Sequence, residues 1–316
     1  MQALATGARA PGVGEQAEMQ GPYVTTYRLL FGNFAIPPGM ERNVNWEGVR
    51  EDISTQILTG GKRAWFAVYE KLEEPTAKRL RYTEEEKERV VAKWGDLYMA
   101  PGYKMRDVYK MLEGPVGMIN LEEGLVDQWS WKRVVLVGDA VRKLEPHAGL
   151  GYNSGVADVV TLVNGLRRLL RTEASPSTAS LEALFASYRD DRMRDMPAIV
   201  DMSMRRARMC AWLSWGDKMM AKYAIPYLPI GALSVNYILG PIVSRVPVLE
   251  WLDESGLPEA AIPYEHHALP VEEREKASLD FRVASRSKSL FGLSNYTTAL
   301  VLATAATIGL RYYQRV

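Results

Sequence analysis

The sequence predicts a mixed fold, α+β or α/β, in which a β-sheet is followed by a strand, a loop and a helix and then by a helical C-terminal region. Three observations predict it. Residues 23–71 are rich in β-forming residues, residues 134–137 are a short β-branched run that ends at a glycine, and apolar side chains recur at helical spacing from about Asn153 onward. With 316 residues, 47% of them hydrophobic, the chain can bury a sizeable core.

Composition excludes several classes of function. The 39 basic and 38 acidic residues nearly cancel, so no charge excess favours binding to nucleic acid. Cys210 is the only cysteine of the sequence, which excludes an internal disulfide and a cysteine-based metal cluster. His266 and His267, two of the three histidines, are adjacent in a segment rich in proline and glutamate, and we expect no metal site there.

Residues 22–130 are predicted to form the sheet domain, in which Thr83 and Glu86 form a predicted capping box that opens a helix. Residues 54–58 and 63–71 form a predicted hairpin, because Gly60 and Gly61 stand between two runs of β-forming residues. Both faces of the second run carry apolar or aromatic groups. The second face of the sheet therefore either lines a hydrophobic pocket or is covered by the protein itself, and the pattern leaves both open.

A strand, a loop and several helices are predicted in residues 131–212, and Pro197 is expected to kink or restart the last helical stretch. The apolar run 134–137 is typical of a strand covered on both faces in a parallel sheet. The loop after it contains Gly149 and Gly151, and glycines let the backbone approach a flat ligand. A helix that opens directly after such a loop directs free N–H groups and its positive dipole end at the ligand. On spacing alone, an ordinary connection between a strand and a helix is the commoner explanation.

The spaced residues of this unit resemble a known motif. The matching positions are Gly138-Asp139, then Pro146-x-x-Gly149-x-Gly151-x-Asn153 and, after four more residues, Asp158. They are similar to the second flavin-binding motif of the FAD-dependent monooxygenases of the aromatic-hydroxylase type. Within that family, the sequence looks most like the fungal enzymes that epoxidise or hydroxylate terpenoid and meroterpenoid intermediates.

The resemblance implies a role for each matched residue. It implies that Asp139 holds the ribityl chain of FAD and that the isoalloxazine ring is surrounded by Pro146, Gly149, Leu150, Gly151 and Asn153. Reduced flavin carries negative charge near N1 and O2, and a helix N-terminus stabilises that charge. Arg142, Leu150 and Tyr152 depart from the family pattern, in which many relatives carry His, Gln and Gly.

The dinucleotide-binding opening of the family is not recognisable in the sequence. Members open with a strand, a Gly-x-Gly-x-x-Gly turn and an acidic residue about twenty positions later. Gly12-x-Gly14 is the nearest match, and no predicted strand precedes it. The resemblance starts at about Tyr23 and covers about the second two thirds of a usual member.

By this resemblance, the chain is predicted to be an FAD-dependent enzyme that epoxidises or hydroxylates a lipophilic terpenoid or meroterpenoid in secondary-metabolite biosynthesis, with NADPH or NADH as electron donor. The flavin supplies the reactive oxygen, so no catalytic side chain is assigned. Trp65, Tyr69 and Tyr152 are candidates for the lining of the substrate pocket. The alternative is a truncated, non-catalytic relative or a partner subunit that binds a lipophilic ligand without binding FAD alone. In that alternative, a partner chain supplies the nucleotide-binding half.

The ends of the chain predict a loose tail and membrane attachment. Residues 1–21 are small and aperiodic, which is typical of a flexible tail. Residues 213–252 include a long uncharged stretch interrupted by prolines, which we expect to associate with a membrane, and residues 253–288 read as a polar linker. Residues 289–310 are uncharged between basic and tyrosine-containing flanks and predict a single transmembrane anchor, with a soluble helix as the alternative. We therefore expect a membrane protein whose main domain is cytosolic.

Overall fold

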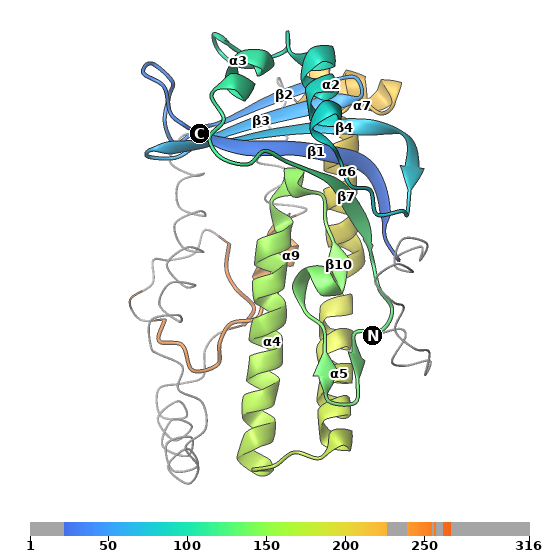
Figure 1. Ribbon diagram of the computed structural model, residues 1–316. Coiled ribbons are helices and arrows are strands. Elements are labelled where there is room, and N and C mark those ends of the chain that lie inside the picture. The colour runs from blue at the N-terminus through green and yellow to red at the C-terminus, as the bar shows by residue number, and fades with distance from the viewer. Residues whose placement is uncertain (1–21, 226–238, 255, 257–261, 267–316) are drawn as a thin grey trace.

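A computed structural model describes residues 22–225, 239–254, 256 and 262–266. In Figure 1 a twisted sheet lies across the upper part of the molecule, and helices extend downward from its lower face. The sheet has six strands in the order β10-β7-β1-β4-β3-β2, and every neighbouring pair is antiparallel. Its strands are β1 (Val24–Ala35), β2 (Asn45–Arg50), β3 (Ile53–Thr59), β4 (Arg63–Thr76), β7 (Gly117–Leu125) and β10 (Arg142–Lys143).

The upper face of the sheet holds the main core. Strands β3 and β4 form the hairpin that the glycines predicted, and alternate residues of β1, β3 and β4 point into the core. Helices α2 (Glu84–Trp94) and α3 (Met105–Lys110) cover them, together with the short strands β5 (Tyr98–Ala100) and β6 (Tyr103–Lys104). Helix α2 begins at a capping box between Thr83 and Glu86, as the sequence indicated.

The lower face of the sheet is covered along only part of its length. Helix α6 (Met196–Cys210) packs there with the short turn η3 (Pro146–Ala148). Tyr27, Tyr69 and Leu121 are buried beneath them. Farther along the same face, the structure leaves side chains open to solvent, so the sheet is neither fully covered nor fully open on this side.

The remaining described helices are α4 (Leu150–Thr172), α5 (Thr178–Met193), α7 (Trp215–Met219), η4 (Met220–Ala224) and α9 (Gly240–Ser244). Helices α4 and α5 run side by side as a long antiparallel pair below the sheet (Figure 1). Pro197 lies in the first turn of α6, so it restarts the helical region after α5, as expected.

The prediction of a doubly covered strand at residues 134–137 was wrong. Only Val134 and Val135 form a strand, β9, and its partner is the equally short β8 (Ser130–Trp131) in a two-stranded hairpin. The side chain of Val134 is exposed. In the described part of the chain no parallel strand pairs with β9.

The predicted membrane localisation also needs correction. No helix in the described ranges is both long enough and apolar enough to cross a bilayer. The proposed anchor at 289–310 and the tail at 1–21 lie outside the described residues. Of the segment 213–252, residues 226–238 lie outside as well, and the described remainder forms only short helices and turns. Most of the predicted linker 253–288 is likewise outside the described residues.

Candidate functional site

The glycine-containing loop and the first turn of α4 form an open surface. Gly138 and Gly149 have φ angles of 59° and 65°, which favour glycine, and no described residue lies within 4 Å of a Cβ built at either of them or at Gly151. Gly149 precedes α4 without a side-chain cap, so the first N–H groups of the helix receive no side-chain acceptor there. A flat or anionic ligand therefore has space and free donors at this helix end.

The predicted flavin-contact residues lie on or beside this surface. Asp139, Pro146, Gly149 and Asn153 are exposed, and Leu150 and Gly151 are half-buried. Asp139 lies in the short turn η2 (Gly138–Ala140), between β9 and β10. The structure thus brings these residues to two adjoining turns and one helix start, and their contact with a flavin stays a prediction.

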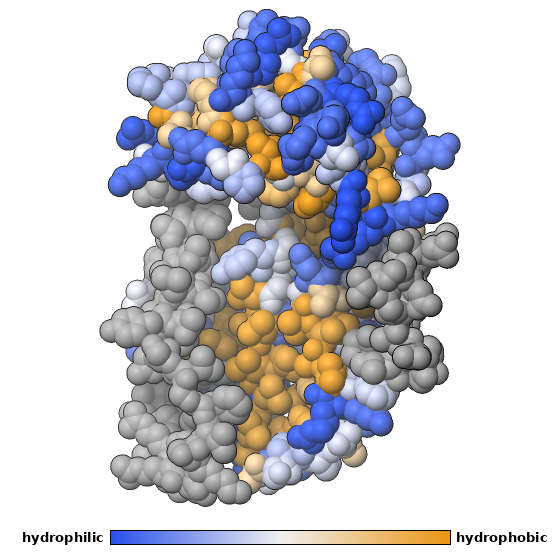
Figure 2. All heavy atoms as spheres, in the orientation of Figure 1, coloured by the Kyte–Doolittle hydropathy of each residue, from blue (hydrophilic) through white to orange (hydrophobic). Residues whose placement is uncertain are grey.

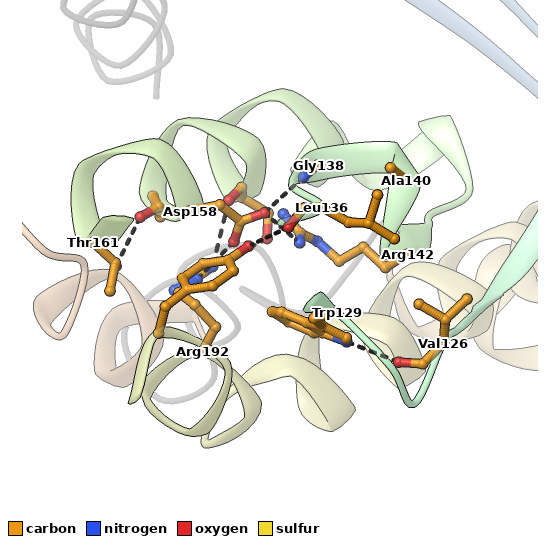
Figure 3. A network of polar contacts seen from close by, with 12 residues as sticks. Val126, Trp129, Leu136, Gly138, Ala140, Arg142, Asp158, Thr161 and Arg192 are labelled. Carbon is orange, nitrogen blue, oxygen red and sulfur yellow. Dashed lines mark hydrogen bonds and ion pairs between the residues drawn. The ribbon is translucent and has the colours of Figure 1, made fainter. Parts of the chain in front are cut away.

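A buried ion cluster holds this loop from behind (Figure 3). The Asp158 carboxylate accepts hydrogen bonds from the backbone N–H of Gly138 at 2.9 Å, from Arg142 Nη1 at 2.6 Å and from Arg192 Nε at 2.9 Å. Both Arg142 and Asp158 are fully buried. One carboxylate therefore ties α4 to η2, β10 and α5, and it orients the turn that presents Asp139.

Behind the loop, positive charge exceeds negative charge within this cluster. Two guanidinium groups share one carboxylate, and the buried Arg142 Nη2 finds no hydrogen-bond partner in the ranges that the structure describes. Arg192 also donates to Ser154, which disperses part of its charge. The sequence marked Asp158 as a motif position and Arg142 as a departure, but it gave no sign of Arg192, which lies on a different helix.

The open part of the lower sheet face is an apolar platform, which we define as Phe31, Leu58, Trp65 and Ile119. All four side chains are exposed. They come from four strands, and the register pairs Leu58 with Trp65 on β3 and β4. Helix α4 begins below this face of the sheet (Figure 1). The platform has the character expected of a surface that binds a lipophilic molecule.

The three predicted pocket residues have different surroundings. Trp65 is 51% exposed and belongs to the platform, whereas Tyr69, on the same face of β4, is only 3% exposed beneath α6 and η3. Tyr152 is 53% exposed in the first turn of α4. Alternation along β4 correctly placed Trp65 and Tyr69 on one face, but it contained no information on how far α6 extends across that face.

A buried polar cluster begins where the platform ends. The ring of Tyr69 packs against the ring of His147, with centroids 3.9 Å apart, and the Tyr69 hydroxyl donates to Gln56 Oε1 at 2.8 Å. His147 Nε2 lies 2.7 Å from Ser54 Oγ. Burial lowers the pKa of His147 to about 3, with a smaller effect from Arg206, so its imidazole is neutral at pH 7.

Two surface hollows lie away from this region. One, of about 430 Å³, is lined by residues of α2 and α3, and the other, of about 100 Å³, lies beside Thr55 and Tyr98. Ile53 and Thr55 point to the upper side of the sheet, opposite Ser54. The loop, the start of α4 and the lower sheet face are therefore the better candidate for a functional site.

Comparison with known proteins supports this assignment. Residues 114–203 match the family described as FAD binding domain. The chain is 33% identical over 192 residues to the FAD-dependent monooxygenase SAT1 of Stachybotrys chartarum, which covers 60% of this chain and 63% of SAT1. It is 30% identical over 239 residues to the FAD-dependent monooxygenase srdH of Neurospora crassa, which covers 71% of this chain and 53% of srdH.

These matches confirm the resemblance read from the motif: the chain is a relative of the FAD-dependent monooxygenases. It spans between about half and two thirds of the length of these relatives. A solved salicylate hydroxylase with substrate aligns at 17% identity and a TM-score of 0.49, covering 78% of this chain and 61% of that one. That likeness is too distant to assign any residue.

The described residues fit one part of an FAD molecule. The uncapped helix end, the open glycine positions and the exposed Asp139 suit the ring and the ribityl chain. In the described ranges we find no glycine-rich turn between a parallel strand and a helix that would suit the adenosine diphosphate part. The matched family model covers residues 114–203, which include the loop and the start of α4.

Proposed function

We propose that this chain carries the ring-binding and substrate-binding part of an FAD-dependent monooxygenase. Its substrate is a lipophilic terpenoid or meroterpenoid intermediate of secondary metabolism, which it epoxidises or hydroxylates with electrons from NADPH or NADH. The observation that carries this proposal is the open glycine loop at the start of α4, which lies below an exposed apolar sheet face. Bound flavin would supply the oxygen-transfer chemistry.

In this proposal the protein positions the reactants and excludes water. The exposed Asp139 accepts hydrogen bonds from ribityl hydroxyls, and the free N–H groups at the start of α4 face the negative edge of the ring. The apolar platform holds the substrate by burying its hydrocarbon surface. No side chain needs to act as a nucleophile.

The test is an absorbance spectrum of the purified chain after incubation with FAD and desalting. The proposal expects bands of bound flavin at close to one flavin per chain. Asp139→Ala should lower the retained flavin, whereas Asp190→Ala, at another exposed carboxylate, should not. A wild-type chain that elutes without flavin contradicts autonomous flavin binding.

The second candidate function is that of a partner subunit, and one observation favours it. The outer face of α4 is apolar and faces away from the side that packs on α5. Tyr152, Val159 and Leu170 are exposed on it, with Val156, Val163 and Leu166 half-buried between them. Figure 2 shows hydrophobic side chains gathered over this part of the molecule.

In this candidate, a nucleotide-binding half from another chain covers the α4 face and completes the FAD site. The relatives contain a substantial length that this chain does not match, which is consistent with such a half. The test is co-elution with the portion of a relative such as SAT1 that this chain does not match, with FAD present. Val159→Asp should abolish co-elution, and Val49→Asp, at an exposed valine of β2, should not.

A further inference from the structure

Glu145 carries a buried carboxyl group directly before residues 146–153, which hold the predicted flavin-ring contacts and are called the ring-contact loop below. It precedes Pro146, and its side chain is fully buried between the loop, the sheet and α6. Among the described residues neither carboxyl oxygen has a hydrogen-bond partner, although the backbone carbonyl of Glu145 accepts from Ser203 Oγ at 3.0 Å. A buried carboxylate without a partner is strongly unfavourable, so this side chain needs either a cation or a proton.

In the described part of the chain, no cation near Glu145 pairs with its carboxyl group. The neighbouring titratable groups are Tyr27 of β1, Glu47 of β2, Tyr69 of β4, Glu123 of β7, His147 of η3, and Arg206, Arg208 and Cys210 of α6. The two arginines are paired elsewhere, because Arg208 donates to Glu123 at 3.0 Å and Arg206 donates to Glu47. Burial, reinforced by Glu123, raises the pKa of Glu145 to about 8, and Arg208 opposes this only in part.

His147 offers an acceptor for that proton. Its Nδ1 has no hydrogen-bond partner within the described part of the chain and lies 3.8 Å from Glu145 Oε2, while its Nε2 lies 2.7 Å from Ser54 Oγ. We assign the neutral tautomer in which Nε2–H donates to Ser54, because Nδ1 is then free to accept. Since the imidazole is neutral, the contact with Glu145 is not an ion pair, and a small movement closes it into a hydrogen bond.

We propose that Glu145 and His147 form a neutral pair that shares one proton and keeps the inner side of the ring-contact loop free of negative charge. The second half of this inference rests on the proposed function. An anionic reduced flavin on the outer side of the loop is stabilised only while the carboxyl stays protonated, because a carboxylate behind the loop repels it across a poorly screening interior. Glu145 then acts as a positioning residue that sets the pH range of flavin reduction.

The first test uses the chain without FAD. We would measure urea unfolding from pH 5 to pH 8.5 for the wild type, Glu145→Gln and Glu113→Gln, the last at an exposed glutamate. Below about pH 6.5 the opposite titration of His147 offsets that of Glu145. From about pH 6.5 towards pH 8, the folding equilibrium constant of the wild type should therefore fall about tenfold per pH unit. Glu145→Gln should remove this fall and Glu113→Gln should keep it. A fall of equal size in Glu145→Gln, or none in the wild type, overturns the pair.

A second measurement identifies the proton directly. Infrared spectra of the wild type should show the carbonyl band of a protonated carboxyl group that disappears as the pH passes through about 8. The band should be absent in Glu145→Gln. A merely structural role of Glu145 would leave no such titrating band, and its absence in the wild type overturns the proposal.

The third measurement is the midpoint potential of bound FAD against pH. In the wild type the potential should fall more steeply above about pH 8, and in Glu145→Gln this break should be absent. Identical curves for the two proteins overturn the influence on the flavin and leave the proton pair standing. A chain that binds no FAD overturns the proposed function instead, while the unfolding and infrared measurements still decide whether the pair exists.

Discussion

The replacement Asp158→Asn tests whether the buried ion cluster holds the candidate site together. The change keeps the shape of the side chain and removes its charge. It leaves Arg142 and Arg192 buried without a counter-ion, and the new amide places an N–H group against a guanidinium. Removing one partner of a buried ion pair costs about 3–5 kcal/mol. Because two cations depend on Asp158, we expect a loss at the upper end of that range.

The assay is urea unfolding at pH 7, monitored by far-ultraviolet circular dichroism. A loss of this size is a large fraction of the about 5–15 kcal/mol that stabilises a typical domain. The matched control is Asp201→Asn, which breaks an exposed pair with Arg205 and should cost about 0.5 kcal/mol or less. A free energy of unfolding for Asp158→Asn within about 1 kcal/mol of the wild type would refute the reasoning, since that result is incompatible with the cost of unpaired buried charges.

A triple replacement separates charge from packing. Arg142→Met, Asp158→Leu and Arg192→Met together remove all three charges and keep similar volumes. Such exchanges of buried ion clusters for apolar side chains are often neutral or stabilising by about 1–4 kcal/mol. We therefore expect the triple variant to be more stable than Asp158→Asn alone. It should still retain less FAD, because Gly138 loses the acceptor that orients its N–H group.

Three further predictions concern the loop and the sheet. Burial lowers the pKa of His147 to about 3, so the unfolded chain takes up a proton at this residue before the folded one does as the pH falls from 6.5 towards 3. In that range the free energy of unfolding should fall less steeply with pH in His147→Gln than in the wild type, by about 1.4 kcal/mol per pH unit. Gly149→Ala, at a φ of 65°, should cost about 1–2 kcal/mol in urea unfolding, whereas Gly61→Ala, outside the left-handed region, should cost less. Trp65→Ser should weaken binding of a lipophilic prenylated probe by about tenfold or more without changing stability, and Tyr98→Ser, at an exposed tyrosine elsewhere, should leave it unchanged.

Local signals predicted the local structure of the chain well. The glycine pair predicted the β3–β4 hairpin, Thr83 and Glu86 predicted the start of α2, and Pro197 predicted a new helix. Each signal depends on residues within a few positions of one another, so its effect on the backbone does not depend on tertiary contacts. The motif from Gly138 to Asp158 is longer but lies in one continuous stretch, and the matches to FAD-dependent monooxygenases confirm what it resembles.

Features that depend on distant partners escaped the sequence. The run 134–137 has the composition of a doubly covered strand, but composition does not say whether a neighbouring strand is present. Arg192, which pairs with Asp158, lies 34 residues further along the chain, on α5. Glu145 belongs to no motif, and its burial depends on how α6 crosses the sheet. Membrane attachment was inferred from uncharged stretches and the residues that flank them, and no helix in the described ranges is long and apolar enough to cross a bilayer.

The two buried clusters together explain why the loop can be open on its outer side and still be well defined. At one end Asp158 fixes η2 with an excess of positive charge, and at the other end the pair of Glu145 and His147 borders η3 without net charge. The negative charge of Asp158 is outweighed by two arginines, and the pair of Glu145 and His147 carries no negative charge. An anion on the outer face is therefore favoured by the Asp158 cluster and by the dipole of α4, and the neutral pair does not oppose it. Ionisation of Glu145 places a negative charge behind the loop, so its titration discriminates between a site built for an anion and a loop that is merely exposed.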